Sequence, residues 1–197
     1  MTPDKALQIL KDGNERFVEN KTLEKDFKFQ IKETAKGQYP FAVVLSCIDS
    51  RVPAEIIFNQ GIGDIFSIRI AGNVANEDIL GSLEYACEEA GSKLILVLGH
   101  TNCGAVKGAI DDIKLGNLTG LLSKIKPAVD ATEPIGDKSS KNGQYVDAVS
   151  KQNVFNTMKM IQDKSPTLDE LIKKGEIKIE SAMYNLETGK VEFYDNK

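Results

Sequence analysis

The sequence predicts an α/β fold with a central, mostly parallel β-sheet flanked by helices. Three short apolar runs carry this prediction: FAVVLSC at 41–47, DIFSIRIAG at 64–72 and KLILVLG at 93–99. The near-continuous apolar character of the first and third runs is typical of strands buried on both faces, as in a parallel sheet. Segments with helical character lie between and after these runs, so strands and helices alternate along the chain.

The N-terminal segment, 1–38, is expected to form a helical arm. Thr2 can cap a helix and Pro3 suits its first position, while apolar residues from Ala6 to Val18 supply a partly helical face. The polar remainder of this segment is expected to be helical in places.

Two helices are expected around the third strand. One begins near Asn76 and ends at Gly91, because glycine commonly follows the last helical turn. The other opens at Cys103, in CGAVKGAIDDIKLG.

The second half of the chain is harder to assign. Residues 121–143 are polar and interrupted by two prolines, and we assign no element to them. Beyond them we expect a helix over 145–163, a short capped helix over 165–175, and a C-terminal β-hairpin over 176–194.

The size of the chain suggests one domain. We predict a single domain, 1–197, made of the N-terminal helical arm (1–38), an α/β core (39–116) and C-terminal helices and strands (117–197).

Composition narrows the functional class. A formal net charge of −4 and the absence of a basic block argue against a nucleic-acid partner, and no apolar stretch approaches a membrane span. Three cysteines, an odd number, make a poor disulfide framework and favour a reducing compartment. The N-terminus does not resemble a signal peptide, so we expect a cytoplasmic protein, although a removed leader would leave no trace here.

Three metal-binding side chains are expected to meet at one edge of the sheet. Cys47 ends the first strand and His100 follows the third, and the carboxyl ends of parallel strands share an edge. Cys103 lies three residues further on, at the start of a helix, where free N–H groups favour a thiolate. Two thiolates and an imidazole suit zinc and leave its fourth position open. We expect Cys87, in the middle of a helix, to be packed inside rather than bound to metal.

An acid and an arginine follow the first cysteine closely. Asp49 is near enough to bind the metal or to accept a hydrogen bond from its water, and Arg51 can pair with Asp49 and hold it ionised. The simpler alternative is an ion pair at a strand end with no catalytic role. Zinc with two thiolates and a neutral imidazole has no net charge, so its water should be less acidic than at a three-histidine site. We therefore expect activity to rise toward alkaline pH.

These motifs resemble those of the β-class carbonic anhydrases. The matching residues are the Cys-x-Asp-Ser-Arg at 47–51 and the His-x-x-Cys at 100–103, within longer similar segments such as GDIFSIRIAGN and LVLGHTNCGAV. The resemblance implies reversible hydration of carbon dioxide at a Zn²⁺ held by Cys47, His100 and Cys103, with Asp49 and Arg51 as the catalytic pair. It also implies a homodimer or a tetramer with the site at the subunit interface.

The resemblance further implies three substrate-binding residues: Gln38, Phe66 and Tyr85. The simpler alternatives are an ordinary loop amide for Gln38 and a core aromatic for Tyr85. Some members hold a regulatory bicarbonate with a tryptophan that is Val44 here, so we expect the non-regulated type, with water on zinc.

Two other functions remain open. A hydrolase acting on carbonyl sulfide or carbon disulfide would use the same ligands. A non-enzymatic zinc or thiol protein would use the cysteines alone, but neither of those roles calls for the Asp49–Arg51 pair.

Overall fold

The computed structural model of the chain describes residues 1–134 and 136–194. Within these residues five strands form one sheet in the order β2-β1-β3-β4-β5. β1 to β4 run parallel and β5 is antiparallel to β4, which confirms the mostly parallel sheet and the C-terminal hairpin. The strands are β1 (Ala42–Ser46), β2 (Ile65–Arg69), β3 (Leu94–His100), β4 (Lys178–Tyr184) and β5 (Val191–Tyr194).

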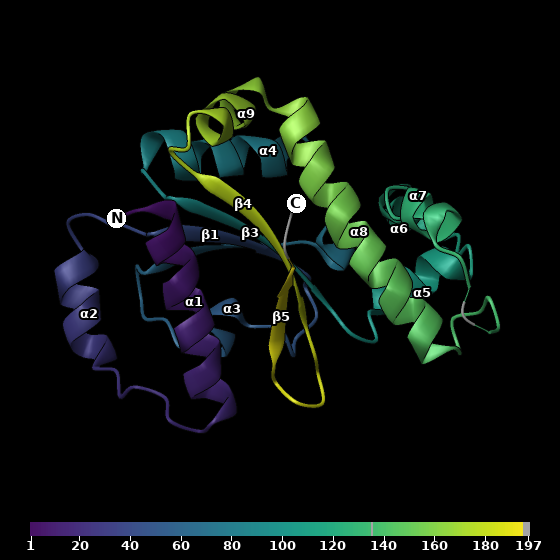
Figure 1. Cartoon of the computed structure of the whole chain (residues 1–197), viewed down its shortest axis with the longest axis horizontal. Helices are drawn as coiled ribbons and strands as arrows, with labels where there is room; N and C mark the ends of the chain where they lie inside the picture. The colour runs from purple at the N-terminus through teal and green to yellow at the C-terminus, as the bar shows by residue number, and fades with distance from the viewer. Residues whose placement is uncertain (135, 195–197) are drawn as a thin grey trace.

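Helices cover both faces of the sheet (Figure 1). Above it in that view are α4 (Glu77–Glu84), α8 (Gly143–Lys164) and α9 (Pro166–Lys173), whereas α1 (Pro3–Val18) and α3 (Ala54–Ile57) lie on the other face. The remaining helical segments are α2 (Phe27–Thr34), η1 (Ala71–Asn73), η2 (Tyr85–Glu89), α5 (Gly104–Ile110), α6 (Gly116–Leu122) and α7 (Lys126–Ala131).

The central strands are buried on both faces, as their composition predicts. Every residue of β1 and β3 is buried. Val43 and Leu45 belong to the apolar cluster that contacts α4, α8 and α9, while Val44 belongs to the cluster under α1 and α3. This two-sided burial holds β1 and β3 in place, and with them the residues at their ends.

The predicted helix starts at Thr2 and near Asn76 are confirmed, and both residues cap their helices. The Thr2 hydroxyl accepts a hydrogen bond from the Lys5 N–H, and the Asn76 side chain accepts one from Ile79. The helix that begins after Asn76 continues through η2, a π-helical turn, and stops before Gly91, whose φ is 78°. This left-handed backbone is the reason for a glycine there.

The unassigned stretch 121–143 contains the end of α6 and the whole of α7. Pro127 does not break a helix but lies in the first turn of α7, where a missing N–H costs nothing. α8, α9 and the hairpin agree with the predicted elements. The division into arm, core and C-terminal part stays a prediction, and residues 135 and 195–197 lie outside the described residues.

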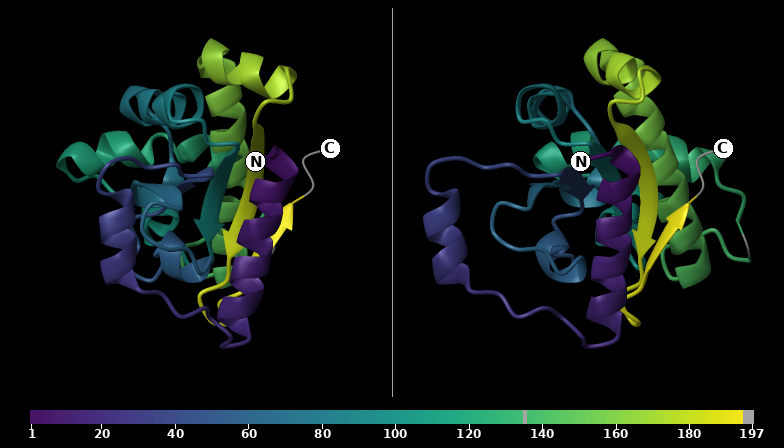
Figure 2. Two further views of the ribbon diagram at one scale, coloured as in Figure 1. Left: turned by 90° about the vertical axis from the view of Figure 1, so that its left-hand side faces the viewer. Right: turned by 60° about the vertical axis from the view of Figure 1, so that its left-hand side comes forward.

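The N-terminal segment splits into two differently placed helices. α1 packs on the sheet of its own chain, with Ala6 and Leu10 fully buried. α2 stands away from the sheet (Figure 2), and none of its residues is buried. Its apolar side chains Phe27, Phe29 and Ile31 are all more than half exposed. The helix therefore presents an apolar surface with no cover from the described residues of this chain.

Candidate metal centre

Three side chains converge at the carboxyl edge of the sheet. The ligand atoms of Cys47, His100 and Cys103 all lie within 4.8 Å of one another, and all three residues are buried. β1 and β3 are adjacent and parallel, with Ser46 opposite Leu98, so the residues after them share an edge. Cys103 caps the start of α5, directly after β3. The backbone therefore brings the two strand ends and the helix start together, as predicted.

The imidazole of His100 has a lone pair free to bind an ion. Its Nδ1 lies 2.9 Å from the carbonyl oxygen of Thr101, which accepts the ring N–H. The other ring nitrogen, Nε2, is buried and has no hydrogen-bond partner among the described residues. A histidine that binds a metal through one ring nitrogen commonly donates the N–H of the other to a carbonyl, which fixes the orientation of the ring. The residues present therefore fit a metal ion, which would satisfy the buried Nε2.

The contact between the two thiols shifts their pKa values in opposite directions. A hydrogen bond from Cys103 lowers the pKa of Cys47 to about 4, and the Gly72 N–H, 3.3 Å from its Sγ, acts in the same direction. The same thiol contact, together with burial, raises the pKa of Cys103, against the opposite effect of the Ala105 and Val106 N–H groups. Two adjacent buried thiolates repel each other, and a divalent cation between them removes that repulsion.

Asp49 lies beside the metal-binding group but is held by Arg51. The guanidinium donates from Nε to Oδ1 at 2.9 Å and from Nη2 to Oδ2 at 2.7 Å, and the Arg51 backbone N–H also reaches Oδ1. These bonds hold the pKa of Asp49 well below its usual range. Oδ2 is 4.0 Å from the Nε2 of His100. An ionised carboxylate is thus fixed next to the position that a metal would occupy.

A second arginine supports this turn, a role that the sequence did not predict. Arg69 donates from Nε to the carbonyl of Cys47 at 3.0 Å and from Nη2 to that of Asp49 at 2.5 Å. It reaches them because β1 and β2 pair with Ser46 opposite Arg69. The strand register decides this role, and no local motif signals it.

The structure keeps the other predicted residues apart from the metal-binding group. The rings of Phe66 and Tyr85 meet edge to face at 6.2 Å and line a hollow of about 560 Å³. Phe66 pairs with Val43, at the opposite end of β1 from Cys47. Cys47 is four positions after Val43, so at about 3.3 Å per residue Phe66 lies about 13 Å along the sheet from the metal-binding edge. Tyr85 is 55% exposed and so is not a core aromatic in this chain.

Two further residues have simple placements. Gln38 is exposed, in the segment between α2 and β1. Cys87 is buried in η2, outside the metal-binding group, and burial raises its pKa to about 12. It is packed inside, as predicted.

Comparison with known proteins decides the family. The model of the carbonic anhydrase family matches residues 42–191, a stretch that includes all three metal-binding side chains and the Asp49–Arg51 pair. This chain belongs to the carbonic anhydrase family. Carbonic anhydrase 2 of Mycobacterium tuberculosis is 37% identical over 196 residues, which cover 98% of this chain and 94% of that protein.

Solved structures of β-carbonic anhydrases share the fold. The Coccomyxa enzyme superposes with a TM-score of 0.74 at 26% identity, over 84% of this chain and 77% of that one. One from Sordaria macrospora, described as tetrameric, gives a TM-score of 0.72 at 24% identity, over 84% and 89%. In the described part of this family member, no helix has the length and apolar character needed to cross a membrane.

Proposed function

We propose that this chain catalyses the reversible hydration of carbon dioxide to bicarbonate and a proton, at a zinc ion held by Cys47, His100 and Cys103. One observation carries the proposal: a buried pair of thiols and a free imidazole nitrogen lie within 4.8 Å of one another in a member of the carbonic anhydrase family. Bound there, zinc would acidify a water molecule and make it a nucleophile.

Asp49 and Arg51 are proposed as the catalytic pair. Arg51 occupies both carboxylate oxygens, which keeps Asp49 charged and restrains it from binding the metal. The free lone pairs of the carboxylate can then accept a hydrogen bond from the reacting water and orient it.

Gln38, Phe66 and Tyr85 are proposed to bind substrate in the centre of a partner subunit. Gln38 precedes β1 and Phe66 lies near its first residues with Tyr85 against it, whereas Cys47 follows its last residue. These three can therefore act at a metal centre only if another copy brings its own group to them. The exposed apolar surface of α2 supports a homodimer, because apolar patches of this kind are commonly buried on association. A tetramer like that of the Sordaria macrospora protein would extend the same arrangement.

Mixing two inactive variants tests this arrangement. Cys47→Ser removes a metal ligand and Phe66→Ala removes a pocket wall. If the pocket belongs to the partner's site, a mixed dimer contains one centre with its own zinc and an intact Phe66 from the other subunit. Activity should return when the two variants are unfolded, mixed and refolded together, and no recovery in verified mixed dimers would place the whole site within one chain.

The activity itself is tested by stopped-flow carbon dioxide hydration together with zinc analysis of the same sample. We expect one zinc per chain and a rate that falls when a chelator removes the metal. Thiol titration should show Cys47 and Cys103 protected until the chelator is added. Metal-free protein with a reactive thiol pair would favour the redox alternative, and faster turnover of carbonyl sulfide than of carbon dioxide would favour the hydrolase. A cytoplasmic location stays a prediction.

A further inference from the structure

We propose that Asn153 is a positioning residue for the metal centre, which acts by holding Gly72 so that its backbone N–H points at the sulfur of Cys47. Asn153 lies on α8, 106 positions after that cysteine, and touches none of the three metal-binding side chains through a hydrogen bond. The inference rests on the metal centre of the proposed function but not on its substrate.

Two hydrogen bonds connect Asn153 to the sulfur. The Nδ2 of Asn153 donates to the Gly72 carbonyl at 2.7 Å, and the Gly72 N–H donates to the Sγ of Cys47 at 3.3 Å. The carbonyl and the N–H belong to the two peptide planes on either side of the Gly72 Cα. Since the backbone angles of Gly72 are set at φ 69° and ψ 19°, fixing one plane fixes the direction of the other.

The loop that carries Gly72 is held from two sides. Gly72 and Asn73 both have positive φ, 69° and 43°, a region that glycine adopts freely and asparagine more readily than most residues. One side is closed by side chains, because a Cβ on Gly72 would lie 2.5 Å from the Cδ1 of Ile125 and 3.3 Å from the Cβ of Ala105. On another side, the Asn153 side chain holds the loop by donating to the carbonyl of Gly72.

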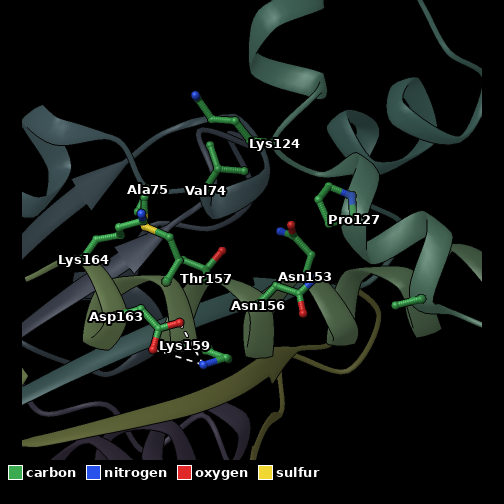
Figure 3. Close-up of a pocket in the computed structure, with 12 residues that line it drawn as sticks. Val74, Ala75, Lys124, Pro127, Asn153, Asn156, Thr157, Lys159, Asp163 and Lys164 are labelled. Atoms are coloured by element: carbon green, nitrogen blue, oxygen red, sulfur yellow. Dashed lines mark hydrogen bonds and ion pairs between the residues drawn. The ribbon is translucent and has the colours of Figure 1, made fainter.

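The position of Asn153 on its helix supports a specific role. It is 2% exposed, on the face of α8 that also buries Val149 and Val154. A buried amide is costly unless it is hydrogen-bonded, and the bond to Gly72 meets that need. Figure 3 shows Asn153 pointing toward Val74 across a groove of about 560 Å³ that α7 and α8 border.

Asn156 provides a matched control. It lies one turn further along α8 and lines the same groove, but it points away from Val74 (Figure 3). Its Oδ1 accepts a hydrogen bond from Gln152 on the same helix at 2.8 Å. Replacing Asn156 removes a similar amide from the same helix without touching the loop at Gly72.

Loss of the Asn153 hydrogen bond should loosen the metal centre without unfolding the chain. A backbone N–H bonded to a ligand sulfur fixes its position and draws charge from it, and removal of such outer contacts typically weakens metal binding about 10- to 100-fold. Leucine has the same branched arrangement of heavy atoms as asparagine, so Asn153→Leu removes the donor with little change in shape and leaves the Gly72 carbonyl without this partner.

The experiment compares Asn153→Leu and Asn153→Asp with Asn156→Leu in the full chain. Zinc affinity is measured by competition with a chelator, and the bond to sulfur is followed by the thiolate-to-metal absorption of the cobalt-substituted protein. Hydrogen exchange of residues 70–75 in metal-free protein reports the loop itself. We expect both Asn153 variants to bind zinc at least tenfold more weakly, with a shifted cobalt band and faster exchange, while Asn156→Leu stays like the parent.

Unchanged zinc affinity and cobalt band in the Asn153 variants, or equal changes in Asn156→Leu, would overturn the inference. The two proposals fail separately. If the parent binds zinc but does not hydrate carbon dioxide, the proposed function is wrong. The inference about Asn153 is then still decided by zinc affinity, the cobalt band and hydrogen exchange. If the parent is active and the Asn153 variants bind zinc as the parent does, only the inference about Asn153 is wrong.

Discussion

Replacement of Asp49 by asparagine separates a catalytic pair from a simple ion pair at a strand end. The substitution keeps the shape of the side chain but removes its charge and turns one of the two acceptors of Arg51 into a donor. Arg51 is about half exposed, so solvent screens the pair. We therefore expect Asp49→Asn to lower the free energy of unfolding by only about 1 kcal/mol, a fall in Tm of about 2–4 °C for a chain of this size.

The expected loss of activity is much larger. If Asp49 accepts a hydrogen bond from the reacting water, kcat/KM for carbon dioxide hydration should fall about 10²- to 10⁴-fold, the usual contribution of a positioned acid or base. The matched control is Asp169→Asn, which breaks a helical ion pair with Lys173 at 2.5 Å. It should cost a similar amount of stability and leave the rate unchanged.

The contribution of Asp49 to the free energy of unfolding should depend on pH. The pKa of Asp49 is lowered in the folded chain, so its charge stabilises the fold above the usual carboxyl pKa of about 3.9. The stability deficit of Asp49→Asn should be constant near neutral pH and shrink as the pH falls below about 4. If the variant keeps more than a tenth of the parent rate while showing this stability deficit, Asp49 and Arg51 are a structural ion pair and the catalytic reasoning is wrong.

Three further predictions concern pH and burial. Activity should rise from neutral toward alkaline pH because two thiolates cancel the charge of zinc, and a rate that is flat across this range in a stopped-flow assay contradicts that. Ser46→Ala should raise the free energy of unfolding by about 1 kcal/mol, since the Ser46 hydroxyl is buried without a partner among the described residues; urea denaturation measures this, and a lower value would reveal a hidden partner. Burial raises the pKa of Cys87 to about 12, so its neutral thiol favours the fold below the usual thiol pKa and this advantage is lost as the pH rises toward 12. The stability difference between the parent and Cys87→Ala should accordingly narrow above about pH 9, and an unchanged difference would mean that Cys87 ionises normally.

Strand ends could be predicted from the sequence because burial on both faces leaves a clear signal. Residues 42–46 and 94–98 are almost entirely apolar, and their parallel pairing then places Cys47 and His100 at one edge without further information. The position of Cys103 near this edge follows because it lies only three residues after His100. The metal-binding group is thus a local consequence of two strands and one helix start, which is why motif and geometry agree.

Other parts gave no such signal. α6 and α7 are short and bury few residues, so their apolar pattern is weak, and Pro127 is as compatible with a helix start as with a break. The contacts of Arg69 depend on the register between β1 and β2, and those of Asn153 on how α8 crosses the sheet. Neither the register of β1 against β2 nor the path of α8 over the sheet can be read from the spacing of residues in the sequence. Buried polar residues on a helix face are a usable hint, and α8 has three of them: Ser150, Asn153 and Thr157.

The arrangement around the two sulfurs suggests how the protein offsets the cost of thiolate ligands. Two thiolates reduce the positive charge that a metal ion can exert on water. The chain places backbone N–H donors against both: Gly72 donates to Cys47, and the N–H groups of Ala105 and Val106 favour the ionised form of Cys103. Each such bond draws charge from a sulfur and so restores part of the acidifying power of the metal. These donors are backbone groups, so only the path of the loop and of α5 can adjust them, and a side chain such as Asn153 that sets this path influences the chemistry from outside the site.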